Sequence, residues 1–122
     1  MVYTSSTLAL AALEVLVQVN RVRNAPGSLV VVPAELPDGL AIETVAVSDL
    51  PSNWRRSPAP EGLAEIGGAW IRRARAAVLA VPSSVIPQEL SYLLHPRHRE
   101  FGRIRIGEAV AFAFDERIRG RA

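Results

Sequence analysis

A run of apolar residues from Leu8 to Val19, interrupted by one carboxylate, constrains this chain more than any other stretch. Bulky residues recur along it at helical spacing, which predicts a helix with a broad core face made of Leu8, Ala12, Val15, Leu16 and Val19. The hydroxyl residues just before the run supply caps for its first turn. Val2 and Tyr3 come earlier still and read as a short β-like segment. We therefore expect a strand that leads directly into a helix.

The carboxylate, Glu14, lies on the narrow remaining stripe of this helix. That stripe consists of Thr7, Ala11, Glu14, Gln18 and Arg21. Periodicity alone favours the interpretation that the stripe faces solvent. In the alternative, the helix is almost buried and Glu14 faces a cleft, where a carboxylate can act on cationic charge. Helical spacing is compatible with both interpretations.

The length of the chain and its missing residue types exclude several kinds of site. Its 122 residues suffice for one domain with a core of its own. Because the chain has no cysteine, disulfides, thiolate catalysis and cysteine–zinc sites are excluded. It has no lysine either, which excludes Schiff-base chemistry and a P-loop. His95 and His98 have no third ligand nearby in the sequence, so we expect two surface histidines in a loop rather than a metal site.

The excess of arginine gives a high isoelectric point but only a small net charge. The pI is about 9.9, while the net charge is +2. This charge gives little support to nucleic-acid binding. The run from Leu8 to Val19 is too short to span a bilayer, and no basic residue precedes it, so neither a membrane span nor a signal peptide is predicted. The expected location is the cytoplasm.

Apolar patterns predict strands on both sides of a second helix. This helix covers residues 61–75, and an ordered loop that packs Trp54 precedes it. Strands are predicted at residues 28–36, 40–47, 77–81, 103–106 and 110–114. The first is expected to be buried on both faces, with Pro33 at an edge or a bulge. Residues 88–95 are ambiguous. Early and late strands with helices between them indicate an α+β domain built on a mixed sheet.

Ser83 and Tyr3 each carry a functional interpretation beside an ordinary one. Ser83 closes a short apolar strand, where loops of mixed sheets commonly carry ligand-binding residues. The ordinary interpretation, a turn at the end of a strand, is preferred for Ser83 on its position alone. Tyr3 on a strand is usually a packing residue with its hydroxyl at the rim. Neither position is decided by the residues alone.

Segments in order along the chain resemble the RES-domain toxin family. They are Val2–Ser5 with the apolar helix to Glu14, Asp49–Pro51 with Trp54, Ile66–Gly67 with Trp70, Val81–Ser83, Ser91–Pro96 and Phe101–Ile106. The resemblance covers nearly the whole chain. It departs from the family at Ser91 and His95, where the family usually has asparagine.

The resemblance implies a fold similar to that of ADP-ribosyltransferases and a toxin of a bacterial toxin–antitoxin pair that degrades NAD by phosphorolysis. In that pattern, Tyr3 contacts the nicotinamide riboside. Glu14 holds the ribose and stabilises the positive charge that develops as nicotinamide leaves. Ser83 binds the nicotinamide side of the substrate. NAD is then a substrate with phosphate as acceptor, and the resemblance implies neither a metal nor a further cofactor.

The same resemblance implies an Xre-type helix-turn-helix antitoxin as partner, with no direct contact to nucleic acid or a membrane. It leaves open two alternatives: transfer of ADP-ribose to a protein, and an inactive remnant that only binds the antitoxin. The family's arginine, in a segment upstream of the tyrosine, has no counterpart before Tyr3. We therefore expect residues 1–122 to form a single, partial RES domain that lacks its N-terminal part and degrades little NAD alone. We also expect a homo-oligomer or a toxin–antitoxin complex.

Overall fold

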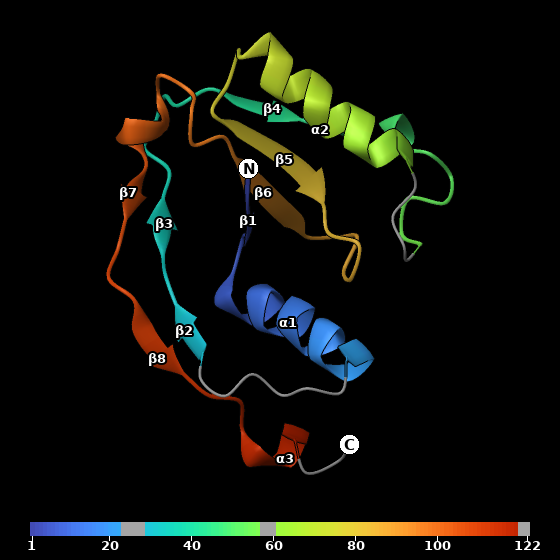
Figure 1. The fold of residues 1–122 in the computed structure, drawn as a ribbon, viewed down its shortest axis with the longest axis vertical. Helices are drawn as coiled ribbons and strands as arrows, with labels where there is room; N and C mark the ends of the chain where they lie inside the picture. Colours follow the sequence, from blue (N-terminus) through green and yellow to red (C-terminus); the bar gives the residue numbers. More distant parts are fainter. Residues whose placement is uncertain (23–28, 57–60, 120–122) are drawn as a thin grey trace.

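A mixed four-stranded β-sheet forms the centre of the protein. The computed structural model describes residues 1–22, 29–56 and 61–119. The strand order is β1–β6–β5–β4, where β1 is Val2–Ser5, β6 is Leu90–Leu94, β5 is Val78–Pro82 and β4 is Ile42–Thr44. Strand β6 is antiparallel to both of its neighbours, and β4 is parallel to β5. Helices accompany this sheet, so the predicted α+β mixed-sheet fold is confirmed (Figure 1).

The N-terminal strand and helix form as predicted. Helix α1 (Leu8–Val22) follows β1 after two residues. Thr7 caps it, because the Leu10 N–H donates to the Thr7 hydroxyl at 3.1 Å. The other helices are α2 (Glu61–Arg73) and the short α3 (Glu116–Arg119), and two 3₁₀ turns cover Val47–Asp49 and Phe101–Arg103. The helix predicted for residues 61–75 is thus confirmed to within two residues.

The core has one apolar layer on each face of the sheet. The layer under α2 consists of Trp70, Leu79 and Leu93, and the opposite layer consists of Leu40, Ala77, Val78, Leu94 and Ile104. Strand β5 contributes to both layers, as its wholly apolar sequence predicts. The indole N–H of buried Trp70 donates to the Ala76 carbonyl at 3.0 Å, so this polar group is satisfied in the core.

A two-stranded ribbon runs along one side of the molecule and extends beyond the sheet (Figure 1). It pairs β2 (Leu29–Val31) with β8 (Val110–Phe112), and β3 (Ala34–Glu35) with β7 (Arg105–Ile106). The prediction of a single strand over residues 28–36 is wrong for residues 29–36. Residue 28 lies outside the described residues. Two short strands replace the predicted one, and Val30 is 62% exposed rather than buried on both faces.

Pro33 explains why this stretch is divided. Proline has no N–H to donate to a ladder, so the ribbon is held here through its carbonyl, which accepts from the Gly107 N–H at 2.8 Å. A side chain at Gly107 would come within 2.7 Å of the Pro33 ring, so the close approach requires glycine. The half-buried strand predicted for residues 103–106 is also corrected. Only Arg105 and Ile106 lie in β7 and both are exposed, whereas Ile104 just before them is buried.

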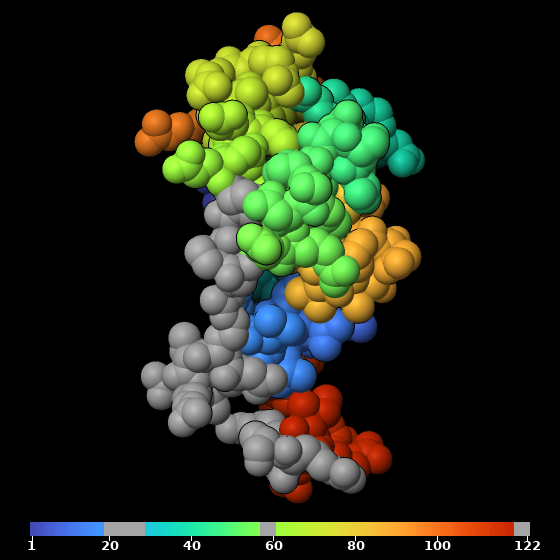
Figure 2. Space-filling model, turned by 90° about the vertical axis from the view of Figure 1, so that its right-hand side faces the viewer, coloured from blue at the N-terminus to red at the C-terminus, as the bar shows by residue number. Residues whose placement is uncertain are grey.

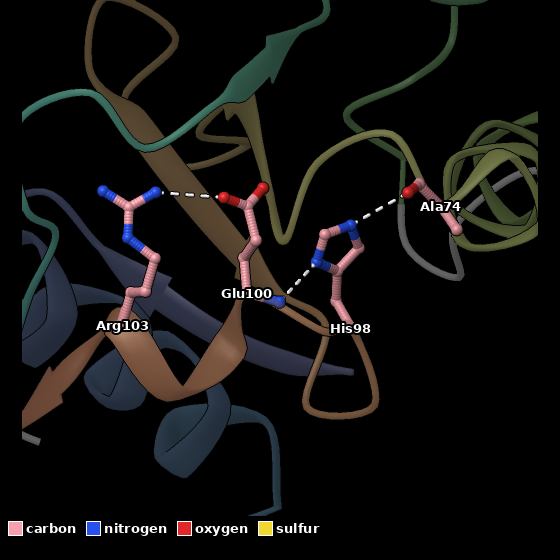
Figure 3. A network of polar contacts seen from close by, with 4 residues as sticks. All are labelled: Ala74, His98, Glu100 and Arg103. Carbon is pink, nitrogen blue, oxygen red and sulfur yellow. Dashed lines mark hydrogen bonds and ion pairs between the residues drawn. The ribbon is translucent and has the colours of Figure 1, made fainter.

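His98 joins the turn after α2 to the loop after β6, as Figure 3 shows. Its Nδ1 accepts from the Glu100 N–H at 3.0 Å, which leaves Nε2 to donate to the Ala74 carbonyl at 2.9 Å. The residue is only 6% exposed, so the expectation of a surface histidine is wrong for His98. Both ring nitrogens are paired, as a buried imidazole requires. Glu100 in turn forms an ion pair with Arg103 at 3.0 Å.

Candidate active site

Three serine hydroxyls surround the carboxylate of Glu14. Oε1 accepts from the hydroxyl of Ser83 at 3.0 Å and from that of Ser91 at 3.2 Å. Oε2 accepts from the hydroxyl of Ser5 at 3.2 Å. Glu14 is half-buried and bonds serines of the sheet. Neither interpretation of its stripe holds as stated, because Glu14 is not free in solvent, the helix is not almost buried, and Glu14 does not line the cleft described below. We call Ser5, Ser83 and Ser91 the serine cradle.

The register of the sheet explains why these serines meet. Ser5 and Ser91 are opposite each other on the antiparallel strands β1 and β6, so their side chains share one face. Val81 on β5 is the other partner of Ser91, and Ser83 lies two residues beyond Val81. Helix α1 passes this end of the three strands and places Glu14 against them. The cradle and Glu14 therefore come from four segments that are separated in the sequence.

Ser83 uses its full hydrogen-bonding capacity within the protein. It is 1% exposed, and its one proton goes to Glu14. Its oxygen accepts from the N–H groups of Val85 at 3.1 Å and Ile86 at 3.2 Å. A hydroxyl has one donor and two lone pairs, so these three bonds satisfy it. The Ser83 hydroxyl thus both stabilises the turn at the end of β5 and bonds Glu14.

Arg55 fastens the turn that contains Ser83. Its Nε donates to the Ser84 carbonyl at 2.8 Å, and its Nη2 donates to the Val85 carbonyl at 3.3 Å. Figure 2 shows this turn (orange) beside the loop that precedes α2 (green) and above α1 (blue). Trp54 is half-buried in that loop, which agrees with the predicted ordered loop; residues 57–60 lie outside the described residues.

An open cleft of about 560 Å³ lies on the other side of α1, between β1 and the ribbon. Its walls are mainly apolar and include Leu8, Ala12, Val15, Val31 and Phe112, with Tyr3 and Tyr92 beside them. The core face predicted for α1 is therefore wrong in part. Leu8 is exposed, and Ala12 and Val15 are half-buried against the cleft, because no close-packed layer faces them. The side chains of residues 19–22 lie outside the described part of the structure.

The structure brings together two of the three residues that the sequence analysis singled out. Glu14 and Ser83 are bonded, whereas Tyr3 is 72% exposed at the rim of the cleft. Glu14 and Ser83 are not among the residues that line the cleft. Ser5 connects the two places, because it lines the cleft and also bonds Glu14. Of the three residues, this cleft therefore has only Tyr3 on its walls.

Sequence reasoning missed Ser5 and Ser91 as members of the site. Ser5 is two residues from Tyr3 on β1, so the two side chains point to the same face of the strand. This was deducible once a strand was predicted there. Ser91 was noted only as a departure from the family's asparagine, and its place beside Glu14 was not deducible because it depends on the pairing of β6 with β1 and β5. Within the described residues, no three His, Cys, Asp or Glu side chains gather where they could hold a metal ion.

The pKa values of His95, Asp115 and Arg117 are shifted from their usual values. Burial lowers the pKa of His95 below its usual 6.5, and the neighbouring His98, amino terminus and Arg97 lower it further. Its ring packs edge-to-face on Trp70, with ring centres 5.7 Å apart. At the start of α3, hydrogen bonds from Arg117 lower the pKa of Asp115, and the same contact raises the pKa of Arg117.

Comparison with known proteins identifies similar chains. Residues 1–115 match the family model described as "RES domain". The chain is 33% identical over 119 residues to a protein named "Toxin Res" from Yersinia enterocolitica, covering 97% of this chain and 77% of that protein. It is 31% identical over 119 residues to "Prs ADP-ribosylating toxin" from a Sphingobium strain, covering 96% and 73%. A "Toxin Res" from Photorhabdus laumondii is 29% identical, with 96% and 74% covered. Among the described residues, no helix has the length and apolar character needed to cross a membrane.

Proposed function

This chain belongs to the RES domain family, and from that premise we propose that it is a toxin that consumes NAD by cleaving the bond between nicotinamide and ribose. The observation that carries the proposal is the Glu14 carboxylate, held by three hydroxyls at 3.0 to 3.2 Å. A carboxylate fixed in this way is suited to stabilise positive charge, because it is oriented before the reaction begins.

The reaction requires charge stabilisation rather than a metal or a nucleophilic side chain. The bond from ribose C1′ to the nicotinamide nitrogen breaks, and its electron pair goes to the pyridine ring, which leaves as neutral nicotinamide. Positive charge then develops at C1′, where Glu14 stabilises it. An oxygen of inorganic phosphate forms the new bond to C1′, so the second product is a phosphorylated ADP-ribose.

Tyr3 is the proposed contact for the nicotinamide riboside. Its exposed ring stands at the rim of the apolar cleft and two residues from Ser5, which bonds Glu14. A flat aromatic ring at this place can stack on a planar heterocycle. The apolar walls of the cleft suit the less polar parts of a bound ligand, and hydroxyl-bearing residues such as Thr4, Ser6 and Thr7 also line it.

A second candidate function is transfer of ADP-ribose to a protein. It is favoured by the relative named "Prs ADP-ribosylating toxin", which is 31% identical to this chain. The first half of the reaction is the same, so Glu14 and Tyr3 keep their roles. Only the acceptor differs, because a protein side chain then attacks C1′ in place of phosphate. An Xre-type antitoxin remains the proposed partner in both cases.

Product analysis of the full-length gene product tests these proposals. The protein is incubated with NAD, with and without inorganic phosphate, and nicotinamide is measured by chromatography. We expect nicotinamide release that requires phosphate, together with a new phosphorus signal from the phosphorylated product. Release without phosphate, with radioactive label from NAD entering a protein band, would establish the second function instead. No nicotinamide release under either condition would contradict both proposed reactions. The remaining alternative would then be an inactive remnant that only binds the antitoxin.

A further inference from the structure

We propose that the serine cradle is a positioning device for Glu14, in which Ser83 and Ser91 fix one carboxylate oxygen and Ser5 leaves the other for the substrate. The inference rests on the proposed function for its kinetic consequences, but its structural content is independent of the substrate. It assigns Ser83 to Glu14 rather than to the nicotinamide.

The assignment of Ser83 follows from its saturated hydroxyl. The side chain is 1% exposed, donates to Glu14, and accepts from the N–H groups of Val85 and Ile86. A substrate amide that bonded this hydroxyl would have to displace one of those partners and leave a buried group unpaired. Ser83 therefore acts on the reaction through the position of Glu14.

Ser91 completes the hold on the same oxygen. It is 8% exposed and donates to Oε1 from β6, while Ser83 donates to Oε1 from the end of β5. Two donors from adjacent strands of one sheet restrict rotation of the carboxylate more than one donor does. β5 and β6 are paired through their full length, and just beyond the last pair the Ser83 N–H donates to the Glu89 carbonyl at 2.8 Å, which holds the two donors close together. Oε1 is thus anchored to the two central strands of the sheet.

Oε2 is in a different situation. Within the part of the chain that the structure describes, its bond comes from Ser5 alone, and Ser5 belongs to the edge strand β1 and lines the open cleft. A ribose hydroxyl that enters from the cleft can replace the Ser5 hydroxyl on Oε2 without disturbing Oε1. The geometry therefore predicts that Oε2 is the oxygen that meets the substrate, and that the two bonds to Oε1 contribute differently to turnover from the one bond to Oε2.

The kinetic test compares serine variants of the full-length gene product in the nicotinamide-release assay. We expect Ser91→Ala to lower kcat by about tenfold or more with KM for NAD within about twofold, because orientation is lost and binding is not. Ser91→Thr should restore most of kcat, since it keeps the hydroxyl. Ser84→Ala, an exposed serine beside Ser83, is the matched control and should match the parent. An unchanged kcat in Ser91→Ala would overturn the proposal.

Inhibition by nicotinamide distinguishes the two roles of Ser83. If Ser83 positions Glu14, Ser83→Ala lowers kcat and leaves the inhibition constant of nicotinamide within about twofold of the parent. If Ser83 bound nicotinamide directly, that constant and KM would rise together while kcat stayed close to the parent value. The second result would overturn the assignment of Ser83.

A double-mutant cycle of thermal unfolding tests the cradle without any turnover. Ser91→Ala, Glu14→Ala and the double variant are melted together with the parent protein. We expect the loss in Tm caused by Ser91→Ala to shrink to less than about half in the Glu14→Ala background, because the shared bond is already gone. Equal losses in the two backgrounds would overturn the cradle. If the parent released no nicotinamide, the proposed function would fail while this cycle still decided the positioning.

Discussion

Ser91 on β6 donates its hydroxyl proton to Oε1 of Glu14 on α1 across 3.2 Å, although 77 residues separate the two in the sequence. The contact ties the N-terminal helix to the central sheet at the end where β1, β5 and β6 come together. It also places a carboxylate beside a cleft, with its orientation set by buried hydroxyls.

Tyr3 should affect binding and not stability. Its ring is 72% exposed, so Tyr3→Ala should change the free energy of unfolding by no more than about 0.5 kcal/mol. The same variant should raise KM for NAD several-fold, because a stacking surface is lost, whereas Tyr3→Phe should keep KM close to the parent value. Urea unfolding and steady-state kinetics check the two parts. A large loss of stability in Tyr3→Ala would show that the ring packs in solution.

His95 should make the protein less stable as the pH falls. Its pKa is below 6.5 in the folded protein, so the unfolded chain binds more protons in the range between the two values. The contribution of His95 is therefore complete above about pH 6.5 and is lost as the pH falls through the folded-state pKa. Urea unfolding of the parent and of His95→Gln at several pH values measures it. The variant should show a smaller loss across this range, and identical pH profiles would contradict the assignment.

Arg55 should control the mobility of the turn that holds Ser83. Its two bonds to the carbonyls of Ser84 and Val85 are exposed, so Arg55→Ala should cost only about 0.5–1.5 kcal/mol of stability. Amide exchange at Val85 and Ile86 should become faster, because those N–H groups bond Ser83 in the same turn. Hydrogen-exchange mass spectrometry measures the change, with exposed Arg56→Ala as control. Equal exchange rates at Val85 and Ile86 in the two variants would contradict the prediction, because they would show that the turn keeps its structure without Arg55.

The exposed apolar residues of the ribbon should cause self-association when no partner is present. Val30 is 62% exposed and Val110 57% exposed, on paired strands. Residues 1–122 should therefore elute as an oligomer or aggregate, and the double variant Val30→Thr/Val110→Thr should elute closer to a monomer. Co-expression with an Xre-type antitoxin should improve solubility. Size-exclusion chromatography with light scattering measures both effects, and a clean monomer that ignores the antitoxin would contradict the prediction.

Elements with strong periodicity were predictable from the sequence. The capped helix α1, the helix α2 and the buried strand β5 each follow from a local pattern, and the order of recognisable segments implied the RES domain. The family pattern also marked Glu14 and Ser83; the structure joins their side chains by a hydrogen bond, and their roles in a reaction stay predictions. Their contact at 3.0 Å was not predictable from spacing, since it depends on how α1 lies across the strands.

Features set by tertiary packing could not be predicted. The face of α1 that looked like a core face borders an open cleft, since nothing in its own sequence reveals what lies opposite. His98 can be buried because the Ala74 carbonyl and the Glu100 N–H pair its two ring nitrogens, and its sequence neighbourhood does not reveal the contact with Ala74. The strand predicted over residues 28–36 was expected to be buried because it is rich in valine, a residue that also favours exposed strands.

Nicotinamide release by Glu14→Gln tests the central claim most directly. The full-length parent protein, Glu14→Gln and the exposed control Glu65→Gln are compared at saturating NAD and phosphate, after circular dichroism has shown that all three are folded. Because glutamine cannot stabilise developing positive charge as a carboxylate does, Glu14→Gln should lose about 100-fold or more in kcat. Glu65→Gln should retain the parent rate. Equal rates in Glu14→Gln and the parent would contradict the claim that the Glu14 carboxylate stabilises the developing positive charge.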